Sequence, residues 1–255
     1  MLSVIIIAKN EEANIRRCLE SVQWADQIVV LDSGSEDKTV EIAKEYTKEV
    51  YQTDWKGYGI QKERALSYAT SDWVLNLDAD ESVDDDLKAE IIAAIASNTA
   101  DAYKVPIRMT FYGQALTYSS SPSRHIRLFK RDGAHYSQDI VHEKIVLPTT
   151  WHIGQLKNAI KHQSFRDISH ALYKINQYSS YTAKTRLERN KIGSLAKTIL
   201  GSGWMFVRCF ILQKGFMDGK AGLVMAILNA QGTFARGLKQ VYPDQSFENP
   251  AKKKG

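Results

Sequence analysis

The sequence predicts an α/β fold: a mostly parallel central sheet with helices on both faces, followed by a helical C-terminal extension. Strand and helix patterns alternate through the first hundred residues, and this alternation favours parallel strands joined by covering helices. Polar residues follow the ends of several strands, where ligands bind in sheets of this kind. From about residue 167 the pattern is helical almost to the end.

Four runs predict the parallel strands, and the first of them, residues 3–8, is a continuous β-branched run, as expected for a strand that helices cover on both faces. Amphipathic segments separate these runs. Ser35 is placed to cap the helix after the second strand, with acidic residues in its first turn. The expected strands are residues 3–8, 27–31, 50–52 and 73–77, and the expected helices include 11–22, 60–69 and 84–97.

The chain changes character after residue 100. Runs at 102–111, 125–130, 143–147 and 152–162 indicate strands of a more mixed or antiparallel part of the sheet. Helices are expected at 168–189, 195–213 and 221–241, with breaks at glycines. We therefore expect a sheet domain of residues 1–165, a basic helical extension of 166–248 and a disordered tail of 249–255.

Charge is divided unevenly along the chain. Residues 1–150 hold 17 Lys and Arg against 24 Asp and Glu, a net of −7, whereas residues 151–255 hold 17 against 5, a net of +12. A basic half suggests contact with nucleic acid or an anionic membrane face. No recognised nucleic-acid module is present, so we expect no nucleic-acid partner. Two widely spaced cysteines, Cys18 and Cys209, favour a reducing compartment over a disulfide framework.

Carboxylates gather directly after the strand expected at 73–77, in the order Asp78-Ala79-Asp80-Glu81. In an extended chain the side chains of Asp78 and Asp80 project to the same side and repel each other unless a cation or donor joins them. Mg²⁺ and Mn²⁺ favour oxygen ligands and often combine one or two carboxylates with substrate phosphates. The alternative is a solvated acidic turn that starts the next helix, and the strand context favours the metal site.

The loop after the first strand, Lys9-Asn10-Glu11-Glu12, contains no glycine. Neither a G-x-G-x-x-G fingerprint nor a Walker loop is present there, which disfavours a dinucleotide-dependent dehydrogenase and a P-loop enzyme.

Three segments together resemble the family 2 glycosyltransferases, which have the nucleotide-diphospho-sugar transferase fold called GT-A. They are VIIIAKNEE at 4–12, IVVLDSGSEDKT at 28–39 and LNLDADE at 75–81, in the family's order and spacing. Further segments look like the subgroup that adds glucose to the inner core of lipopolysaccharide: RLFKR at 127–131, VHE at 141–143 and KGFMDGKAG at 214–222. The resemblance covers nearly the whole chain.

This resemblance implies an inverting hexosyltransferase that moves glucose from UDP-glucose, with Mg²⁺ or Mn²⁺, onto a heptose of the lipopolysaccharide inner core. Residues 1–100 would bind the nucleotide sugar, and residues 101–165 would supply the acceptor side and the catalytic base. The Gln-x-x-Arg-Trp signature of processive synthases is absent, which favours transfer of a single sugar.

The resemblance also implies a nucleotide pocket. Asp32 would accept a hydrogen bond from the base, and Ala8 and Glu11 would line the pocket. Lys62 stands where the family often has the Arg of an Arg-Asn pair and would contact the nucleotide, but Glu63 replaces the Asn.

The family further implies roles for residues around the diphosphate. Asp78 would lie near the ribose, and Asp80 would bind the metal, with Asp78 and His142 as further candidate ligands. Glu143 is our candidate base, because the acceptor hydroxyl must lose a proton as it attacks and a carboxylate within hydrogen-bond reach takes it. Asp139 is the second candidate for that role.

Arg127 lies in a basic stretch that ends at Arg131. Its guanidinium suits contact with a diphosphate or a phosphorylated acceptor. A solvated strand edge, kept from aggregating by charge, is the alternative, and the residues alone leave both open.

Apolar and aromatic residues between 204 and 228 alternate with basic ones. They predict either interfacial helices on an anionic bilayer or helices packed internally with a solvated basic face. No stretch reaches the roughly 20 apolar residues of a spanning helix; the nearest, 204–212, is short and contains Arg208. Because the implied acceptor is lipid-anchored, we favour a peripheral position on the cytoplasmic face of the inner membrane.

Two other functions stay open from the sequence alone. A nucleotidyltransferase that makes the sugar nucleotide would share the crevice but would be expected to have a glycine-rich triphosphate loop near the first strand. A non-catalytic, membrane-associated binding protein would use the basic half without binding nucleotides.

Overall fold

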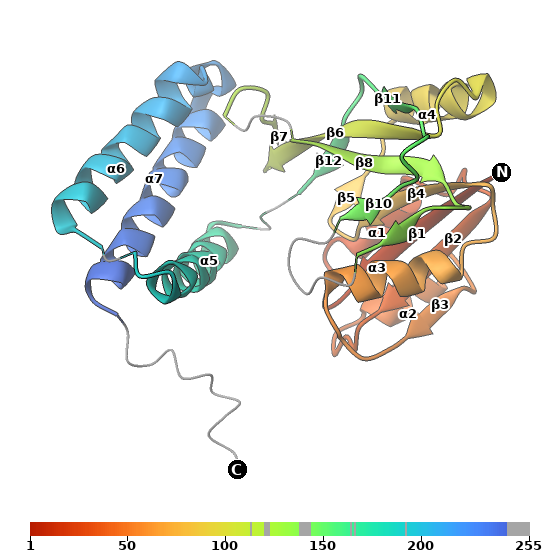
Figure 1. Cartoon of the computed structure of the whole chain (residues 1–255), viewed down its shortest axis with the longest axis horizontal. Helices are drawn as coiled ribbons and strands as arrows, with labels where there is room; N and C mark the ends of the chain where they lie inside the picture. The colour runs from red at the N-terminus through yellow and green to blue at the C-terminus, as the bar shows by residue number, and fades with distance from the viewer. Residues whose placement is uncertain are drawn as a thin grey trace, which may run out of the picture. The chain divides into compact units, whose positions relative to one another are not determined.

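The computed structural model describes residues 1–112, 114–119, 123–137, 144–163, 165, 167–191 and 193–243 (Figure 1). The chain forms two compact units. The sheet unit comprises Met1–Thr110 and Pro122–Ser164, and the helical unit comprises Phe111–Ser121 and Phe165–Gly255. The predicted extension of 166–248 did not include Phe111–Ser121. The predicted tail of 249–255 lies outside the described residues.

The sheet has the strand order β3-β2-β1-β4-β8-β6-β12-β5. The first four strands in this order are parallel, as predicted, and β8 is antiparallel to both of its neighbours. Strands β11 and β12 pair in parallel with β6, and β5 is antiparallel to β12. The bounds are β1 (Leu2–Ala8), β2 (Gln27–Asp32), β3 (Val50–Gln52), β4 (Trp73–Asp78), β5 (Glu81–Ser82), β6 (Ala102–Phe111), β8 (Ser123–Lys130), β11 (Ile153–Gln155) and β12 (Ile160–His162).

Helices cover both faces of this sheet, as β1 makes clear. Val4 and Ile6 point into a core shared with α1 (Ile15–Glu20), α2 (Thr39–Lys44) and α4 (Asp85–Ser97), because successive side chains of a strand alternate between faces. Ile5 points into the opposite core, shared with α3 (Tyr58–Ser67). Burial of each such side chain stabilises the fold by about 1.5–3 kcal/mol. Helices on both faces of the sheet therefore explain why β1 is apolar throughout, as predicted.

Two expectations about local structure are wrong. Ser35 does not cap a helix: α2 begins at Thr39, and the Ser35 hydroxyl donates instead to the Asp32 carboxylate. Residues 152–162 form two short strands, not one. Glu90 of α4 accepts from the backbone N–H groups of Lys157 and Asn158, both at 2.8 Å. These bonds hold the turn between the two strands.

A separate two-stranded antiparallel sheet follows β8 in the chain. It pairs β9 (His135–Tyr136) with β10 (Ile145–Val146), and β10 falls within the strand expected at 143–147. Three predicted functional residues, Asp139, His142 and Glu143, lie outside the described residues.

The helical unit contains β7 (Gln114–Ala115), α5 (Ile168–Glu188), α6 (Leu195–Val207), a π-helical turn η1 (Arg208–Leu212), a 3-10 turn η2 (Gly215–Asp218) and α7 (Gly219–Val241). Helices α6 and α7 lie side by side (Figure 1). A Cβ on Gly237 of α7 would stand 2.3 Å from Oγ1 of Thr198 in α6, so glycine permits this close approach. The predicted helical character of this part of the chain is confirmed.

Asp218 organises one end of the helical unit. Its carboxylate accepts from the backbone N–H groups of Thr117, Tyr118 and Ser119 at 3.0, 3.0 and 2.7 Å, and from the Ser119 hydroxyl at 2.6 Å. Burial alone would raise the pKa of Asp218, but these donors lower it below its usual value. The carboxylate therefore ties segment 117–119 to the start of α7.

Candidate active site

The loops that follow β1, β2 and β4 lie at one edge of the sheet, as predicted, because these strands are parallel neighbours. Side chains join the first two loops directly. Asn10 N–H donates to Ser35 Oγ at 2.8 Å, and Glu36 N–H donates to Asn10 Oδ1 at 2.9 Å. Glu11 N–H donates to Thr39 Oγ1 at 2.8 Å. The edge is therefore a bonded set of loops with little freedom to separate.

Asp32 is buried at the end of β2 and shapes its loop. One carboxylate oxygen accepts from Gly34 N–H at 3.0 Å and Ser35 N–H at 2.9 Å, and the other accepts from the Ser35 hydroxyl. Gly34 has a φ of +83°, which glycine adopts readily. A carboxylate offers about four acceptor positions, so one remains for a base. The base-binding role of Asp32 stays a prediction.

The other residues expected at the nucleotide pocket lie on the first loop. Ala8 ends β1 and is buried. Glu11 follows it, and its Oε2 accepts from Asn14 Nδ2 at 2.7 Å, which fixes the side chain against the start of α1. Their contacts with a nucleotide stay predictions.

Asp78, Glu81, Lys62 and Arg127 form what we call the buried ion network. Lys62 Nζ lies 3.3 Å from Asp78 Oδ1, and Arg127 Nη2 lies 2.9 Å from Asp78 Oδ2. The same Arg127 nitrogen lies 2.7 Å from Glu81 Oε1. Although desolvation opposes the charged form, the two cations hold the pKa of Asp78 well below its usual range. Asp78 is thus an ionised carboxylate with a fixed orientation.

Glu81 is the most deeply buried acid of this network, with 1% of its side chain exposed. Burial raises its pKa to about 7, against the opposing effect of Arg127. Its Oε2 also accepts from Asp78 N–H at 2.9 Å, which holds the turn after β4. Sequence reasoning included Glu81 in the acidic motif but gave it no role in the site.

Asp80 has different partners from Asp78. The expectation that Asp78 and Asp80 share one side of an extended strand is wrong, because β4 ends at Asp78 and the chain turns through residues 79–80. Asp80 Oδ2 lies 3.0 Å from His162 Nε2, and Arg17 Nη2 donates to the Asp80 carbonyl at 3.0 Å. Burial disfavours the imidazolium, but Asp80 raises the pKa of His162 above its usual value.

Sequence reasoning missed His162. The residue was expected only as the last position of a strand, and it does end β12. That strand pairs with β5, which places His162 opposite Glu81. The residue type and the strand end were visible signals, but the partner stands 82 residues away in the sequence.

The donor chemistry suits a divalent metal at Asp80. Among the described residues no group of three or more His, Cys, Asp or Glu side chains is arranged to hold a metal ion. Such a metal would therefore draw its remaining ligands from water and substrate phosphates, which is common for Mg²⁺. Asp78 is the weaker candidate ligand, because both of its oxygens face cations. The ligand roles of Asp80, Asp78 and His142 stay predictions.

The structure excludes one of the two predicted environments of Arg127, a solvated strand edge. Strand β8 lies between β4 and β6, and only 8% of the Arg127 side chain is exposed. Contact with a diphosphate stays a prediction. Lys62 is equally buried, and its neighbour Glu63 accepts from Tyr136 N–H at 2.6 Å. The Glu that replaces the family's Asn thus holds strand β9.

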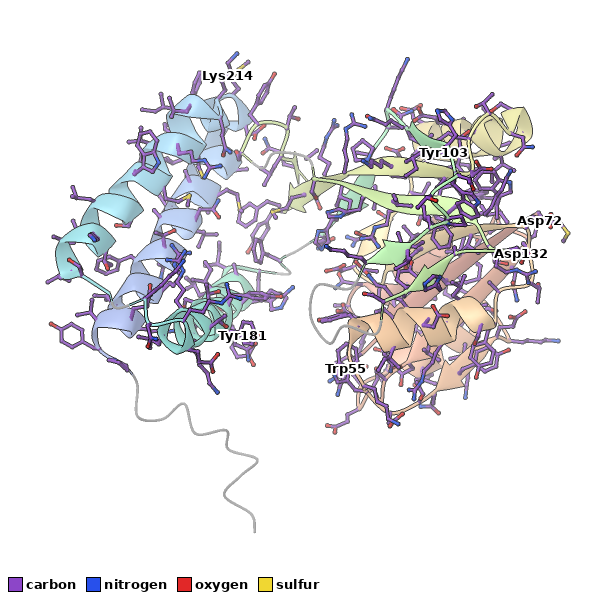
Figure 2. All side chains as sticks on the ribbon, viewed as in Figure 1. Trp55, Asp72, Tyr103, Asp132, Tyr181 and Lys214 are labelled. Atoms are coloured by element: carbon purple, nitrogen blue, oxygen red, sulfur yellow. The ribbon has the colours of Figure 1, made fainter. Side chains whose placement is uncertain are left out.

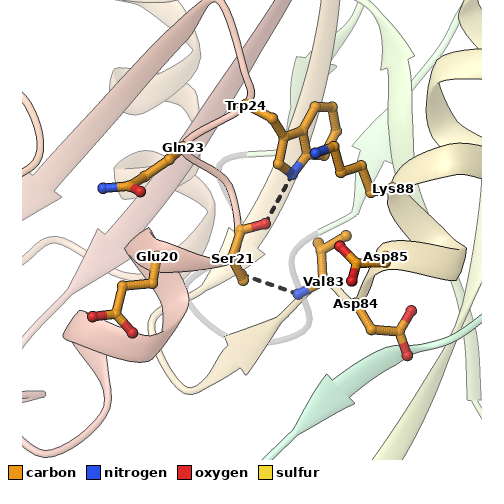
Figure 3. Close-up of a pocket in the computed structure, with 8 residues that line it drawn as sticks. All are labelled: Glu20, Ser21, Gln23, Trp24, Val83, Asp84, Asp85 and Lys88. Carbon is orange, nitrogen blue, oxygen red and sulfur yellow. Dashed lines mark hydrogen bonds between the residues drawn. The ribbon is translucent and has the colours of Figure 1, made fainter.

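A surface hollow of about 400 Å³ lies apart from these residues (Figure 3). It is formed by the end of α1, the following loop and the start of α4. Trp24 Nε1–H donates to the Ser21 carbonyl at 2.8 Å, and Val83 N–H donates to Ser21 Oγ at 3.1 Å. The first bond lies within the loop and the second ties the loop to the segment before α4. None of the predicted site residues lines the hollow.

The strand order and the helices on both faces of the sheet define the GT-A fold. A solved structure with the same fold is the mannosyltransferase PcManGT from Pyrobaculum calidifontis, determined with GDP-Man and Mn²⁺. The TM-score is 0.51 at 14% identity, over 94% of this chain and 87% of that one. At this identity the likeness concerns the fold alone.

The chain belongs to glycosyl transferase family 2, whose family model matches residues 3–154. It is 34% identical over 250 residues to an uncharacterized glycosyltransferase of Rickettsia typhi, covering 93% of this chain and 86% of the relative. It is 29% identical over 262 residues to the lipopolysaccharide core biosynthesis glycosyltransferase LpsC of Rhizobium meliloti, covering 95% of each. The predicted family, fold and enzyme class are confirmed.

Proposed function

We propose that this glycosyltransferase moves a single hexose, with inversion, from a nucleotide-diphospho sugar onto a saccharide of the lipopolysaccharide inner core. Glucose from UDP-glucose is the donor we favour, and a heptose is the acceptor. The observation that carries the proposal is that the two aspartates at the end of β4 have different partners. Asp78 is held by two cations, whereas Asp80 faces His162.

In this proposal Asp78 and Asp80 have separate tasks. Asp78, ionised and fixed by Lys62 and Arg127, would accept hydrogen bonds from the ribose. Asp80 would hold the divalent metal, Mg²⁺ or Mn²⁺. When bound, such a metal stabilises the negative charge that grows on the departing diphosphate. Asp32 would accept from the base, and Ala8 and Glu11 would line the pocket.

Deprotonation of the acceptor needs a base near the anomeric carbon. Glu143 is the residue we propose, with Asp139 as the second candidate, because a carboxylate can accept the proton as the hydroxyl attacks. Glu143→Gln is expected to bind the donor normally and to lose transfer by at least about 100-fold, the lower range of general base catalysis. Full transfer by this variant would remove Glu143 from the role.

Two observations support the choice of acceptor and location. LpsC, similar over 95% of both chains, is named for lipopolysaccharide core biosynthesis. The chain after residue 150 carries a net charge of +12, which suits the anionic cytoplasmic face of a membrane where a lipid-linked acceptor would be presented.

Asp80→Asn tests the central assignment. We expect sugar transfer to fall by about 100-fold or more, because the leaving diphosphate loses its electrostatic stabilisation. Metal-dependent binding of UDP, followed by calorimetry, should weaken in parallel. Asp86→Asn, an exposed acid in the first turn of α4, is the matched control and should keep both activities.

Donor and acceptor are tested with a panel of nucleotide sugars and purified lipopolysaccharide core oligosaccharides. UDP release that depends on both UDP-glucose and a heptose-terminated core supports the assignment. Turnover with a different donor alone would replace glucose and leave the transferase in place. Pyrophosphate release from UTP and a sugar phosphate would point to nucleotidyl transfer instead.

A further inference from the structure

Helix α6 turns its large apolar side chains toward solvent. Ile199, Leu200, Trp204 and Ile211 are 54%, 73%, 58% and 53% exposed, and Val207 lies on the same side. The spacing from Leu200 to Trp204, Val207 and Ile211 places them along one stripe of a helix. We call these five residues the apolar face. Figure 2 shows side chains projecting outward along α6, away from α7.

The opposite side of α6 packs against α7 with smaller groups. Thr198 and Cys209 are buried there, and Cys209 Sγ approaches Met205 Sδ at 3.7 Å. A surface helix in water has the reverse arrangement, with apolar residues toward the core and polar residues outside. The apolar face therefore indicates a partner that is itself apolar.

The structure also corrects the sequence prediction that only 204–212 approaches the length of a spanning helix. Leu195–Leu212 is helical throughout, and among the described residues it is the one helix long and apolar enough to cross a membrane by length and composition. Only 11% of that window is buried. A core helix of a soluble domain would have most of this window covered.

The charged residues from α6 to the end of α7 are nearly all basic. Residues 195–243 contain six basic residues, Lys197, Arg208, Lys214, Lys220, Arg236 and Lys239. The only acid in this range is Asp218, whose carboxylate is occupied by segment 117–119. A second copy of the chain would bring the same basic helices together, whereas anionic lipid headgroups would complement them.

Lys197 and Arg208 distinguish an interfacial helix from a spanning one. They are 11 residues apart, about three helical turns, so both lie on one flank of α6 beside the apolar face. In the hydrocarbon centre such charges are costly, but at the interface their long side chains reach the headgroups. The arrangement suits a helix that lies in the plane of the bilayer surface.

We propose that α6 is a membrane-docking helix that rests in the interfacial layer of an anionic bilayer, with its apolar face in the acyl region. This deepens the proposed function, which supplies only the reason for attachment: a lipid-linked acceptor. Vesicle binding is expected whether or not the chain transfers glucose, so failure of one proposal does not imply failure of the other.

The test is flotation of the full chain with vesicles of phosphatidylcholine alone and of phosphatidylcholine with phosphatidylglycerol. We expect binding to the anionic vesicles. Leu200→Glu should lower the partition coefficient by about ten-fold or more, since a charge would replace a leucine that enters the acyl region on binding. Ile92→Glu, in α4 of the sheet unit and 49% exposed, is the matched control and should bind normally. Circular dichroism verifies that both variants fold.

Three further measurements, lipid quenching, sedimentation and sugar transfer, separate the possible outcomes. Brominated lipids should quench wild-type fluorescence from a shallow depth, and the quenching should disappear in Trp204→Phe while flotation persists. Deep quenching would indicate a spanning helix and overturn the proposal. Equal flotation of wild type and Leu200→Glu would overturn it too, as would a dimer in sedimentation that Leu200→Glu dissociates without affecting flotation. Turnover with a soluble core oligosaccharide, measured in parallel, reports separately on the proposed function.

Discussion

The sheet unit and the helical unit treat burial in opposite ways. The sheet unit covers the apolar residues of its central strands on both faces and buries ionisable side chains as well, among them Arg127 and Glu81. The helical unit leaves Leu200 and Trp204 of α6 in contact with solvent. Burying charges requires partners at fixed distances, whereas exposed apolar groups require an apolar neighbour. The difference separates a preorganised site for chemistry from a surface for attachment.

Charge follows the same division. The acidic first 150 residues carry the carboxylates of the candidate site, and the basic remainder carries α5, α6 and α7. Cations within the sheet unit serve particular acids: Arg127 bridges Asp78 and Glu81, and Lys62 binds Asp78. In the helical unit, basic residues flank an apolar surface. Variants that remove one partner at a time should therefore cost most in the sheet unit.

Arg127→Met should have the largest effect on stability. It would leave Glu81 buried without its cation and Asp78 with Lys62 alone, and breaking a buried ion pair in this way costs about 3–5 kcal/mol in the free energy of unfolding. Urea denaturation measures this loss. Adding Glu81→Gln should restore part of it, because a neutral amide needs neither a cation nor a proton at this buried position.

Lys130→Met is the matched control on the same strand. Lys130 Nζ lies 2.9 Å from Asp101 Oδ1, but both side chains are about one-third exposed, so the loss should be much smaller than that of Arg127→Met. Equal losses for Arg127→Met and Lys130→Met would contradict the claim that the sheet unit depends on the buried ion network.

Local patterns in the sequence predict most of the fold but little of the site's geometry. The runs that form β1, β2 and β4 are apolar on both faces because helices cover both faces, so pattern and structure share one cause. The parallel order then places the loop residues at one edge. Local patterns do not predict which basic side chain contacts which carboxylate, because Arg127 stands 49 residues from Asp78 and His162 stands 82 residues from Asp80.

The same limit explains the errors. Ser35 has the composition of a helix cap, and only the buried Asp32 carboxylate beside it shows that its hydroxyl is used elsewhere. Asp78 and Asp80 do not lie on one extended strand, because Glu81 holds a turn directly after β4. For α6 the apolar character was visible in the sequence, but which side faced α7 required the structure.

Asp218→Asn should have an intermediate effect, confined to the helical unit. Loss of a charged acceptor for three backbone donors costs about 1–3 kcal/mol. Hydrogen exchange of the Thr117, Tyr118 and Ser119 amides should accelerate. Ser119→Ala removes the hydroxyl donor alone and should cost less.

The pH dependence of stability gives a second test of the role of Asp218. Its pKa is lower in the folded chain, so its contribution to stability is complete above the unfolded pKa, about 4, and is lost as the pH falls through the lower folded value. In Asp218→Asn this part of the acid dependence should be missing. Unchanged exchange at segment 117–119, at neutral and acidic pH, would show that other contacts hold it.

Gly203→Ala should have the smallest effect, and its sign is informative. Gly203 lies in the exposed side of α6, and a Cβ there would have nothing within 4 Å, so alanine should stabilise the helix by about 0.5–1 kcal/mol. Gly222→Ala is the contrasting variant: its Cβ would stand 1.9 Å from the Gly215 carbonyl oxygen, so it should destabilise clearly. Thermal unfolding separates the two. If Gly203→Ala also destabilised the free protein, something must cover that side of α6 in solution, and the contrast between a closed sheet unit and an open helical face would no longer hold.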